Sequence, residues 1–291
     1  MGFESFSNSR IGIGTAVAVS RVLPRSPASG LARVVAGRLA ANSASPMVRA
    51  IRANQYVASG RTLDAVELDV AAREVLTNSG RYLYDLFSLR PGKEAIMRLV
   101  HRDATFDRVL DEVRSRAHVY ASCHLGSFDI VGQSLGYNGW RAQVLSVPNP
   151  NGGYKAQNDI RELSGLEMTP VSMESLKAAA RRLAEGGSVV TGLDRPIPDP
   201  RIRPVFFKEP SALPLLHVRL AMQAKAPVVV VACPLCEDGT YQLLASDPIE
   251  MTGADQLANA TRVLAVAEEF ITAHRLQWVM PHAVWPDVEA P

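Results

Sequence analysis

The sequence predicts an α/β protein in which a largely parallel central sheet is flanked by helices and preceded by a helical N-terminal region. From residue 118 onward, short β-branched runs alternate with helical patterns, which is typical of parallel strands joined by crossover helices. Residues 227–233 form a nearly continuous valine run, as expected of a strand buried on both faces. Before residue 118, apolar residues recur at helical spacing.

The N-terminal region, residues 1–62, is predicted to be a basic helical segment close to a membrane, and residues 63–291 a single α/β domain. Residues 1–63 contain eight arginines, no lysine and the single acid Glu4, so this stretch is strongly positive although the whole chain carries only +2. Such polarity favours contact with an anionic surface, membrane or nucleic acid, and a simply solvated basic face is the alternative. Arginines interleaved with apolar residues at 31–39 suit an interfacial helix or one packed on the domain.

The individual elements follow from periodicity and from residues that start or stop helices. The region 63–117 is expected to be helical, with a break at Pro91-Gly92. Ser172 is the expected N-cap of a helix that stops at Gly186-Gly187. Strands are predicted at 118–123, 142–147, 168–171, 188–193, 205–207 and 227–233, the last forming a hairpin with 241–245, and helices at 128–135, 154–164, 174–185, 213–224 and 255–274.

Composition narrows the class of protein. With 47% hydrophobic and 21% charged residues, the chain is typical of a folded globular protein. It contains no apolar run of the roughly 20 residues that a transmembrane helix needs. The odd count of three cysteines gives no disulfide framework, and the pair Cys233 and Cys236 lacks a second ligand pair for zinc, so we expect structural cysteines and no metal site.

Polar residues directly follow two predicted strands, at the edge where open α/β sheets bind their ligands. One place is His124, with Gly126 at the turn and Asp129 in the first turn of the next helix; the other is Asp194-Arg195. The H-x4-D spacing is weak by itself, because residues 282–287 also match it, but only the first match lies between a strand and a helix. We expect Asp129 to hold one imidazole nitrogen of His124 and leave the other free as a base.

The stretch 122–129 resembles the H-x4-D/E motif of the lysophospholipid acyltransferase superfamily, most closely the branch of bacterial lipid A acyltransferases and phosphatidylinositol mannoside acyltransferases. Further similarity runs in the same order along most of the chain. Ser127 and Phe128 depart mildly from the usual motif, and Lys208 replaces a usual glycine. The matching fragments are Arg52-Ala-Asn54, Arg161 with Gly165, Asp194-Arg195, Phe206-Phe207 and Gln277-Trp278 with His282 and Trp285.

The resemblance implies an acyltransferase without a cofactor, moving a fatty acyl group from acyl-CoA or acyl carrier protein to a hydroxyl of a membrane (glyco)lipid. His124 would be the general base and Asp129 its orienting carboxylate. Backbone N–H groups near Gly126 and Ser127 are candidate donors to an oxyanion. Candidate substrate-binding residues are Asp194, Arg195, Arg161 and Arg203. A strand-end cap is the alternative for Asp194 and a solvated basic loop for the arginines. A covalent mechanism through Cys123 is the rival chemistry.

The expected partners are a lipid acceptor, the thioester donor and an anionic membrane surface, with acyl carrier protein left open and nucleic acid not expected. The expected location is peripheral, on the cytoplasmic face of the inner membrane. Two other functions stay open: a lipid or thioester hydrolase, and a non-catalytic membrane-binding module of the same fold. The stretch Gly126-Ser127-Phe128 is not the Gly-x-Ser-x-Gly elbow of serine hydrolases, and the chain has no other good match to it and no phosphate-loop or dinucleotide-binding pattern.

Overall fold

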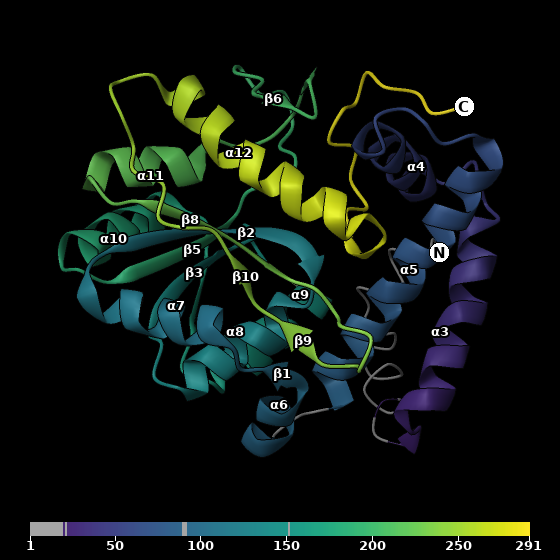
Figure 1. Ribbon diagram of the computed structural model, residues 1–291, viewed down its shortest axis with the longest axis horizontal. Coiled ribbons are helices and arrows are strands. Elements are labelled where there is room, and N and C mark those ends of the chain that lie inside the picture. The colour runs from purple at the N-terminus through teal and green to yellow at the C-terminus, as the bar shows by residue number, and fades with distance from the viewer. Residues whose placement is uncertain (1–19, 21, 89–91, 151) are drawn as a thin grey trace.

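The computed structural model describes residues 20, 22–88, 92–150 and 152–291, so residues 1–19 and 21 of the predicted N-terminal region 1–62 lie outside it. The predicted α/β architecture is confirmed (Figure 1). A six-stranded sheet has the order β10-β8-β2-β5-β3-β4, and every neighbouring pair in it is parallel except β10 with β8. Its strands are β2 (His118–Gly126), β3 (Ala142–Ser146), β4 (Glu167–Pro170), β5 (Ser188–Gly192), β8 (Val228–Cys233) and β10 (Leu244–Ala245).

Helices cover both faces of this sheet (Figure 1). The helices of the α/β part are α6 (Lys93–Leu99), α7 (Ala104–Ser115), α8 (Phe128–Tyr137), α9 (Gly152–Glu162), α10 (Met173–Ala184), α11 (Leu216–Ala224), α12 (Gln256–Ala273) and the short 3-10 helix η1 (Arg275–Gln277). Along the central strands, alternate side chains belong to two separate buried clusters. One contains Val228 and Val230 with α10, α11 and α12, and the other contains Val229 and Val231 with α7 and α8. This is the period of two that a strand buried on both sides requires.

Local signals in the sequence explain where several helices begin. Ser172 caps α10 as predicted, and its hydroxyl accepts a hydrogen bond from the backbone N–H of Ser175. Asp255 caps α12 by accepting from the N–H groups of Leu257 and Ala258. The helix predicted from residue 213 begins later, at Leu216, because residues 211–215 form a connection whose Ala212 is bonded to Val284.

Two small pairings lie outside the main sheet, and the predicted hairpin lies within it. The strand expected at 205–207 is only β6 (Val205–Phe206), which forms its own hairpin with β7 (Glu209–Pro210). The predicted hairpin between 227–233 and 241–245 is confirmed through β10. The first part of the segment 241–245, β9 (Tyr241–Gln242), pairs instead with β1 (Val100–His101).

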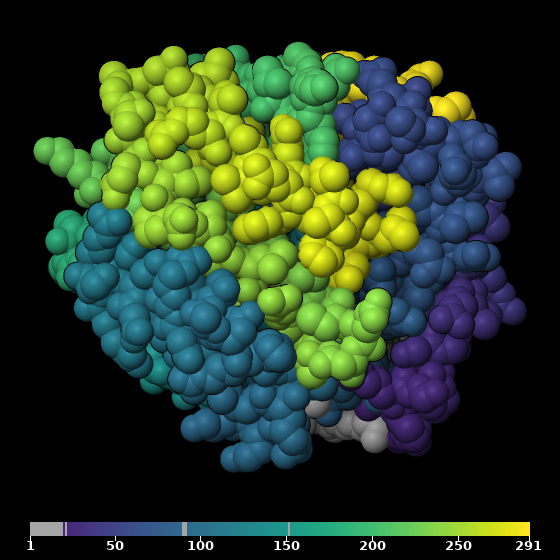
Figure 2. Space-filling model, in the orientation of Figure 1, coloured from purple at the N-terminus to yellow at the C-terminus, as the bar shows by residue number. Residues whose placement is uncertain are grey.

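The helices α3 (Arg25–Ala40), α4 (Pro46–Ala58) and α5 (Ala65–Ser88) stand together at one side of the α/β part (Figure 1). Buried Asp85 of α5 ties this side together, because it pairs with Arg25 at 2.8 Å and accepts a hydrogen bond from Tyr241 at 2.7 Å. The C-terminal residues lie against the surface of α4 and α5 (Figure 2). The predicted division at residue 62 stays a prediction. None of the described helices is both long and apolar enough to cross a membrane.

Candidate active site

The candidate site lies at the C-terminal end of β2, where this strand stops pairing regularly with β8. Backbone pairing of β2 with β8 runs to Ser122, then shifts register so that Gly126 pairs with Cys233. In this irregular stretch the carbonyl of His124 accepts a hydrogen bond from the N–H of Val279 at 2.8 Å. His124 was predicted on a loop but lies within β2, with 42% of its side chain exposed. Its ring is therefore both fixed in the sheet and open to solvent.

Asp194, which directly follows β5, holds the imidazole of His124. Its Oδ1 lies 2.6 Å from Nδ1 of His124, and its Oδ2 accepts from the backbone N–H of His124 at 2.7 Å and from Nε1 of Trp278 at 2.8 Å. The Asp194 side chain is completely buried. A buried carboxylate that accepts at Nδ1 requires the proton on that nitrogen, which leaves Nε2 as the basic nitrogen.

The carboxylate predicted to hold His124 was Asp129, and this geometry is corrected by the structure. Asp129 lies in the first turn of α8, as expected, but its carboxylate forms an ion pair with the Nε of Arg161 in α9. Arg161 also donates to Asn158 at 2.9 Å. Asp194, predicted to bind substrate or cap its strand, takes the orienting place because parallel β5 lies directly beside β2 and ends at the same edge.

The turn after His124 has a strict steric requirement. Gly126 has a φ of +72°, and a Cβ there would lie 1.7 Å from the carbonyl oxygen of Cys233. That same oxygen accepts a hydrogen bond from the N–H of Ser127 at 2.8 Å. The Ser127 N–H is therefore engaged and is not a free oxyanion donor, whereas the buried Ser127 hydroxyl has no hydrogen-bond partner among the described residues. Gly192 is also close, since a Cβ there would lie 3.3 Å from Cε1 of His124.

The three arginines predicted to bind substrate have different surroundings. The guanidinium of Arg195 lies 5.4 Å from the ring centre of Tyr154 in α9 and donates to its hydroxyl at 3.2 Å. Arg161 reaches the site through Asp129. Arg203, in contrast, lies on the exposed β6–β7 side and pairs with Asp287 at 2.7 Å.

Two site residues were missed by the chemical reasoning from sequence. Trp278 supports Asp194, and His282 lies close enough to Arg195 and His124 for their charges to act on it. Burial, followed by those two neighbours, lowers the pKa of His282 to about 4, so this imidazole is neutral at physiological pH. Both belong to the C-terminal fragment Gln277-Trp278…His282…Trp285, and that fragment was the only signal for them.

Cys123 does not have the surroundings of a nucleophile. Its side chain is buried among the apolar residues of one core cluster. Burial, with the nearby Asp194 charge, raises the pKa of its thiol well above the ordinary value. The covalent alternative considered from the sequence is therefore disfavoured, because a nucleophilic cysteine needs an accessible thiolate.

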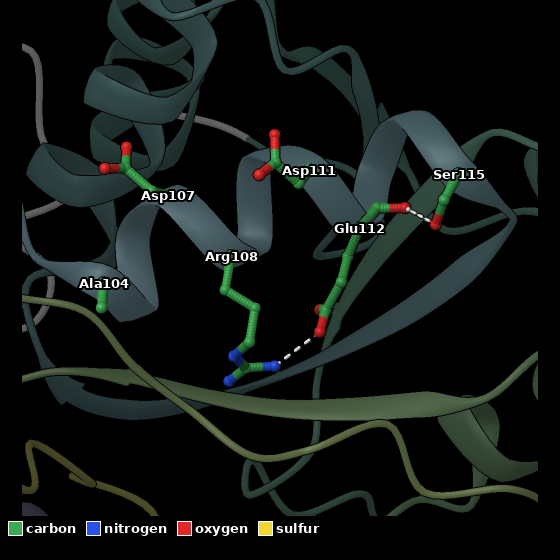
Figure 3. A pocket seen from close by; sticks show the side chains of 6 residues that line it. All are labelled: Ala104, Asp107, Arg108, Asp111, Glu112 and Ser115. Atoms are coloured by element: carbon green, nitrogen blue, oxygen red, sulfur yellow. Dashed lines mark hydrogen bonds and ion pairs between the residues drawn. The ribbon is translucent and has the colours of Figure 1, made fainter.

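A surface hollow lies away from His124, along α7 (Figure 3). It is lined by residues of this single helix, and each of its charged side chains has an ion-pair partner. Arg108 pairs with Glu112 at 2.6 Å and donates to the carbonyl of Ala245 in β10 at 2.8 Å. No histidine or carboxylate from the carboxyl ends of the parallel strands contributes to it. This hollow is a surface feature beside the sheet's edge strand.

Comparison with known protein families agrees with the resemblance found in the motifs. The model of the bacterial lipid A biosynthesis acyltransferase family matches residues 11–286. The chain belongs to this family. The match includes His124, Asp194 and the C-terminal fragment with Trp278. No curated protein matches the chain at a significant level. Membership makes the protein an acyltransferase of lipid biosynthesis and places a lipid acceptor and an acyl donor among its substrates.

Proposed function

We propose that the protein transfers a fatty acyl group from a thioester, acyl-CoA or acyl carrier protein, to a hydroxyl of a membrane (glyco)lipid, with His124 as general base. The observation that carries this proposal is the hydrogen bond of 2.6 Å between Nδ1 of His124 and Asp194. It leaves Nε2 on a ring that is 42% exposed, which is where an acceptor hydroxyl must arrive.

In this mechanism Nε2 of His124 removes the proton of the acceptor hydroxyl as its oxygen attacks the thioester carbonyl carbon. The new C–O bond forms, the C–S bond breaks, and the imidazolium returns its proton to the leaving thiolate. Asp194 stabilises the imidazolium in between and keeps the proton on Nδ1. No covalent enzyme intermediate is needed, in agreement with the buried thiol of Cys123.

The tetrahedral intermediate needs hydrogen-bond donors for its oxyanion. Because the N–H of Ser127 is bonded to Cys233 and its hydroxyl is buried, the candidate moves to the N–H of Phe128 at the start of α8. The N-terminus of a helix favours a developing negative charge. We assign Gly126 to the tight turn that places this group beside His124.

Arg161 belongs to α9 and Arg195 lies against Tyr154 of the same helix, with its positive charge acting on His282. We assign Arg195, stacked on Tyr154, to an anionic part of the donor or acceptor such as a phosphate. Asp129 acts through Arg161, since the two form an ion pair that joins α8 to α9. Arg203 has an exposed partner in Asp287 and is assigned to the surface loop rather than to the reacting groups.

Membrane contact is proposed for the N-terminal helices. Leu31 and Val34 of α3 are exposed, and Arg33 and Arg38 are exposed on the same helix. Exposed apolar and basic side chains on one helix suit a peripheral position on an anionic bilayer, which we place at the cytoplasmic face of the inner membrane. In flotation with phosphatidylglycerol vesicles, a smaller fraction of the Leu31→Ser/Val34→Ser variant than of wild type should float with the vesicles. Equal fractions would contradict this assignment.

The experiment that tests the function is transfer of a radiolabelled palmitoyl group from palmitoyl-CoA, or from palmitoyl acyl carrier protein, to a total bacterial lipid extract. Wild type should give a labelled lipid and His124→Ala should give none. Labelled free fatty acid in place of a labelled lipid would identify a hydrolase. No turnover with either donor, in a folded protein, would support the non-catalytic membrane module.

A further inference from the structure

The C-terminal segment, residues 275–285, supplies much of the site although it holds only one turn of helix. Trp278 donates to Asp194, the N–H of Val279 donates to the carbonyl of His124, and His282 lies beside Arg195. After η1 this chain belongs to no helix and to no named strand of the described residues. Its backbone groups therefore need partners from elsewhere to stay in one conformation.

Asn54 of α4 provides those partners, although it lies far away in the sequence. Its Nδ2 donates to the carbonyl of Met280 at 3.0 Å and to that of His282 at 2.8 Å, and its Oδ1 accepts from the N–H of Val284 at 3.1 Å. The side chain is buried, with 1% of the residue exposed. One amide thus satisfies the backbone of three alternate residues, as a neighbouring strand would.

These contacts form a continuous connection from α4 to the Nδ1 side of the His124 ring. Asn54 fixes the segment just after Trp278, the indole of Trp278 fixes one oxygen of Asp194, and the other oxygen of Asp194 fixes Nδ1 of His124. Each link is a direct hydrogen bond of 3.0 Å or less. Figure 1 shows α4 lying beside the end of the chain that carries this segment.

We propose that Asn54 is a positioning residue for acyl transfer, which fixes the C-terminal segment and through it the orientation of Asp194 and His124. This inference rests on the proposed function and extends it to the helical N-terminal side of the molecule. It gives a chemical reason for the asparagine of the Arg52-Ala-Asn54 fragment, because only a side-chain amide both donates twice and accepts. Movement of a reacting group by about 1 Å can cost about 100-fold in rate.

The chain offers a matched control at the next position. Gln55 is equally buried and binds the same segment, since its Nε2 donates to the carbonyl of Arg275 at 3.1 Å and its Oε1 accepts from that residue's guanidinium at 2.7 Å. These bonds precede Trp278 and do not extend to the backbone of residues 280–284. Gln55→Ala therefore also removes buried hydrogen bonds of a side-chain amide to this segment, but it leaves the hydrogen bonds to residues 280–284 in place.

The test compares Asn54→Ala with Gln55→Ala in the full chain, by kcat and KM for the thioester and by the low-field proton resonance of the Nδ1–H of His124 near pH 7. Asn54→Ala should lower kcat by about 10- to 100-fold, leave KM within about twofold, and weaken or shift the resonance. Gln55→Ala should leave kcat and the resonance unchanged. If Asn54→Ala does not fold, Asn54→Ser is measured in the same way.

Two results would overturn the proposal: an unchanged resonance and kcat in Asn54→Ala, or equal losses in both variants. Thermal unfolding of both variants accompanies the kinetics. If wild type itself transfers no acyl group, the proposed function fails, while the resonance still decides whether Asn54 positions His124. The two failures are thereby distinguished.

Discussion

The candidate site contains two carboxylates in different surroundings: Asp194 in the buried part, called the inner half, and Asp129 in the more exposed part, called the outer half. In the inner half, Asp194 is completely buried and accepts three hydrogen bonds from His124 and Trp278. In the outer half, Asp129 is a fifth exposed and pairs with Arg161 of α9. A carboxylate with no water contact and fixed neutral donors orients a ring, whereas one paired with an arginine at the surface organises charge for a substrate. The difference implies separate roles for the two acids, and these are not the roles expected from the sequence, in which Asp129 orients His124 and Asp194 binds substrate.

The largest effect should come from the inner half. Asp194→Asn keeps the shape of the side chain but favours the wrong tautomer of His124, and a comparable change in a serine protease triad costs about 10⁴-fold in kcat. We expect a loss of about 10³- to 10⁴-fold, measured as initial rates of acyl transfer. A loss below about tenfold would mean that the two halves are not distinct.

The ion pair of the outer half should matter less and act as one unit. Asp129→Asn is expected to lower activity by about 10- to 100-fold, because general positioning effects of this size follow small displacements. The double variant Asp129→Asn/Arg161→Gln should then be no worse than Asp129→Asn, since the partner is already lost. Additive losses in the double-mutant cycle would show that Asp129 acts on something other than Arg161.

Arg195 should affect binding more than chemistry. Arg195→Lys retains the charge but loses the planar stack on Tyr154, worth about 0.5–1 kcal/mol at an exposed site. KM for the anionic substrate should rise about fivefold while kcat changes little. Arg203→Lys is the control, with both constants within about twofold of wild type, because that residue pairs with Asp287 on the surface.

The smallest change is expected in the pH profile of a His282 variant. Burial, with Arg195 and His124 nearby, lowers the pKa of His282 to about 4, so it gains no proton between pH 8 and about pH 5. His282→Asn should leave the shape of kcat against pH unchanged in that window, whatever its effect on the absolute rate. A shift of the acidic limb of this profile would mean that His282 titrates in this pH range, and would contradict its assignment as a neutral residue.

The fold was predictable wherever a local pattern decides the structure. The valine run of β8, the Ser172 cap and the break after β2 are set by residues close together in the sequence. The length of β2 was not predictable from a local pattern. Its last residues are held by residues far away in the sequence, since Gly126 pairs with Cys233 and Leu125 pairs with Trp278.

The site was predictable in its histidine but not in its partner. Asp129 is five residues from His124 and was expected in the first turn of the next helix, which made it the obvious candidate. Asp194 arrives because β5 is inserted between β2 and β3 in the sheet. Strand order depends on how helices pack over the sheet, which no spacing along the chain encodes. The role of Trp278 depends on the same long-range assembly.

The contact between Trp278 and Asp194 also sets when the protein becomes an enzyme. During synthesis, domains fold as the chain emerges from its N-terminal end. His124 and Asp194 leave the ribosome well before Trp278, so an incomplete chain has this histidine and this aspartate but not the indole that donates a hydrogen bond to Asp194. Acyl transfer by a nascent chain is therefore expected only after residue 278 has emerged and folded back onto Asp194.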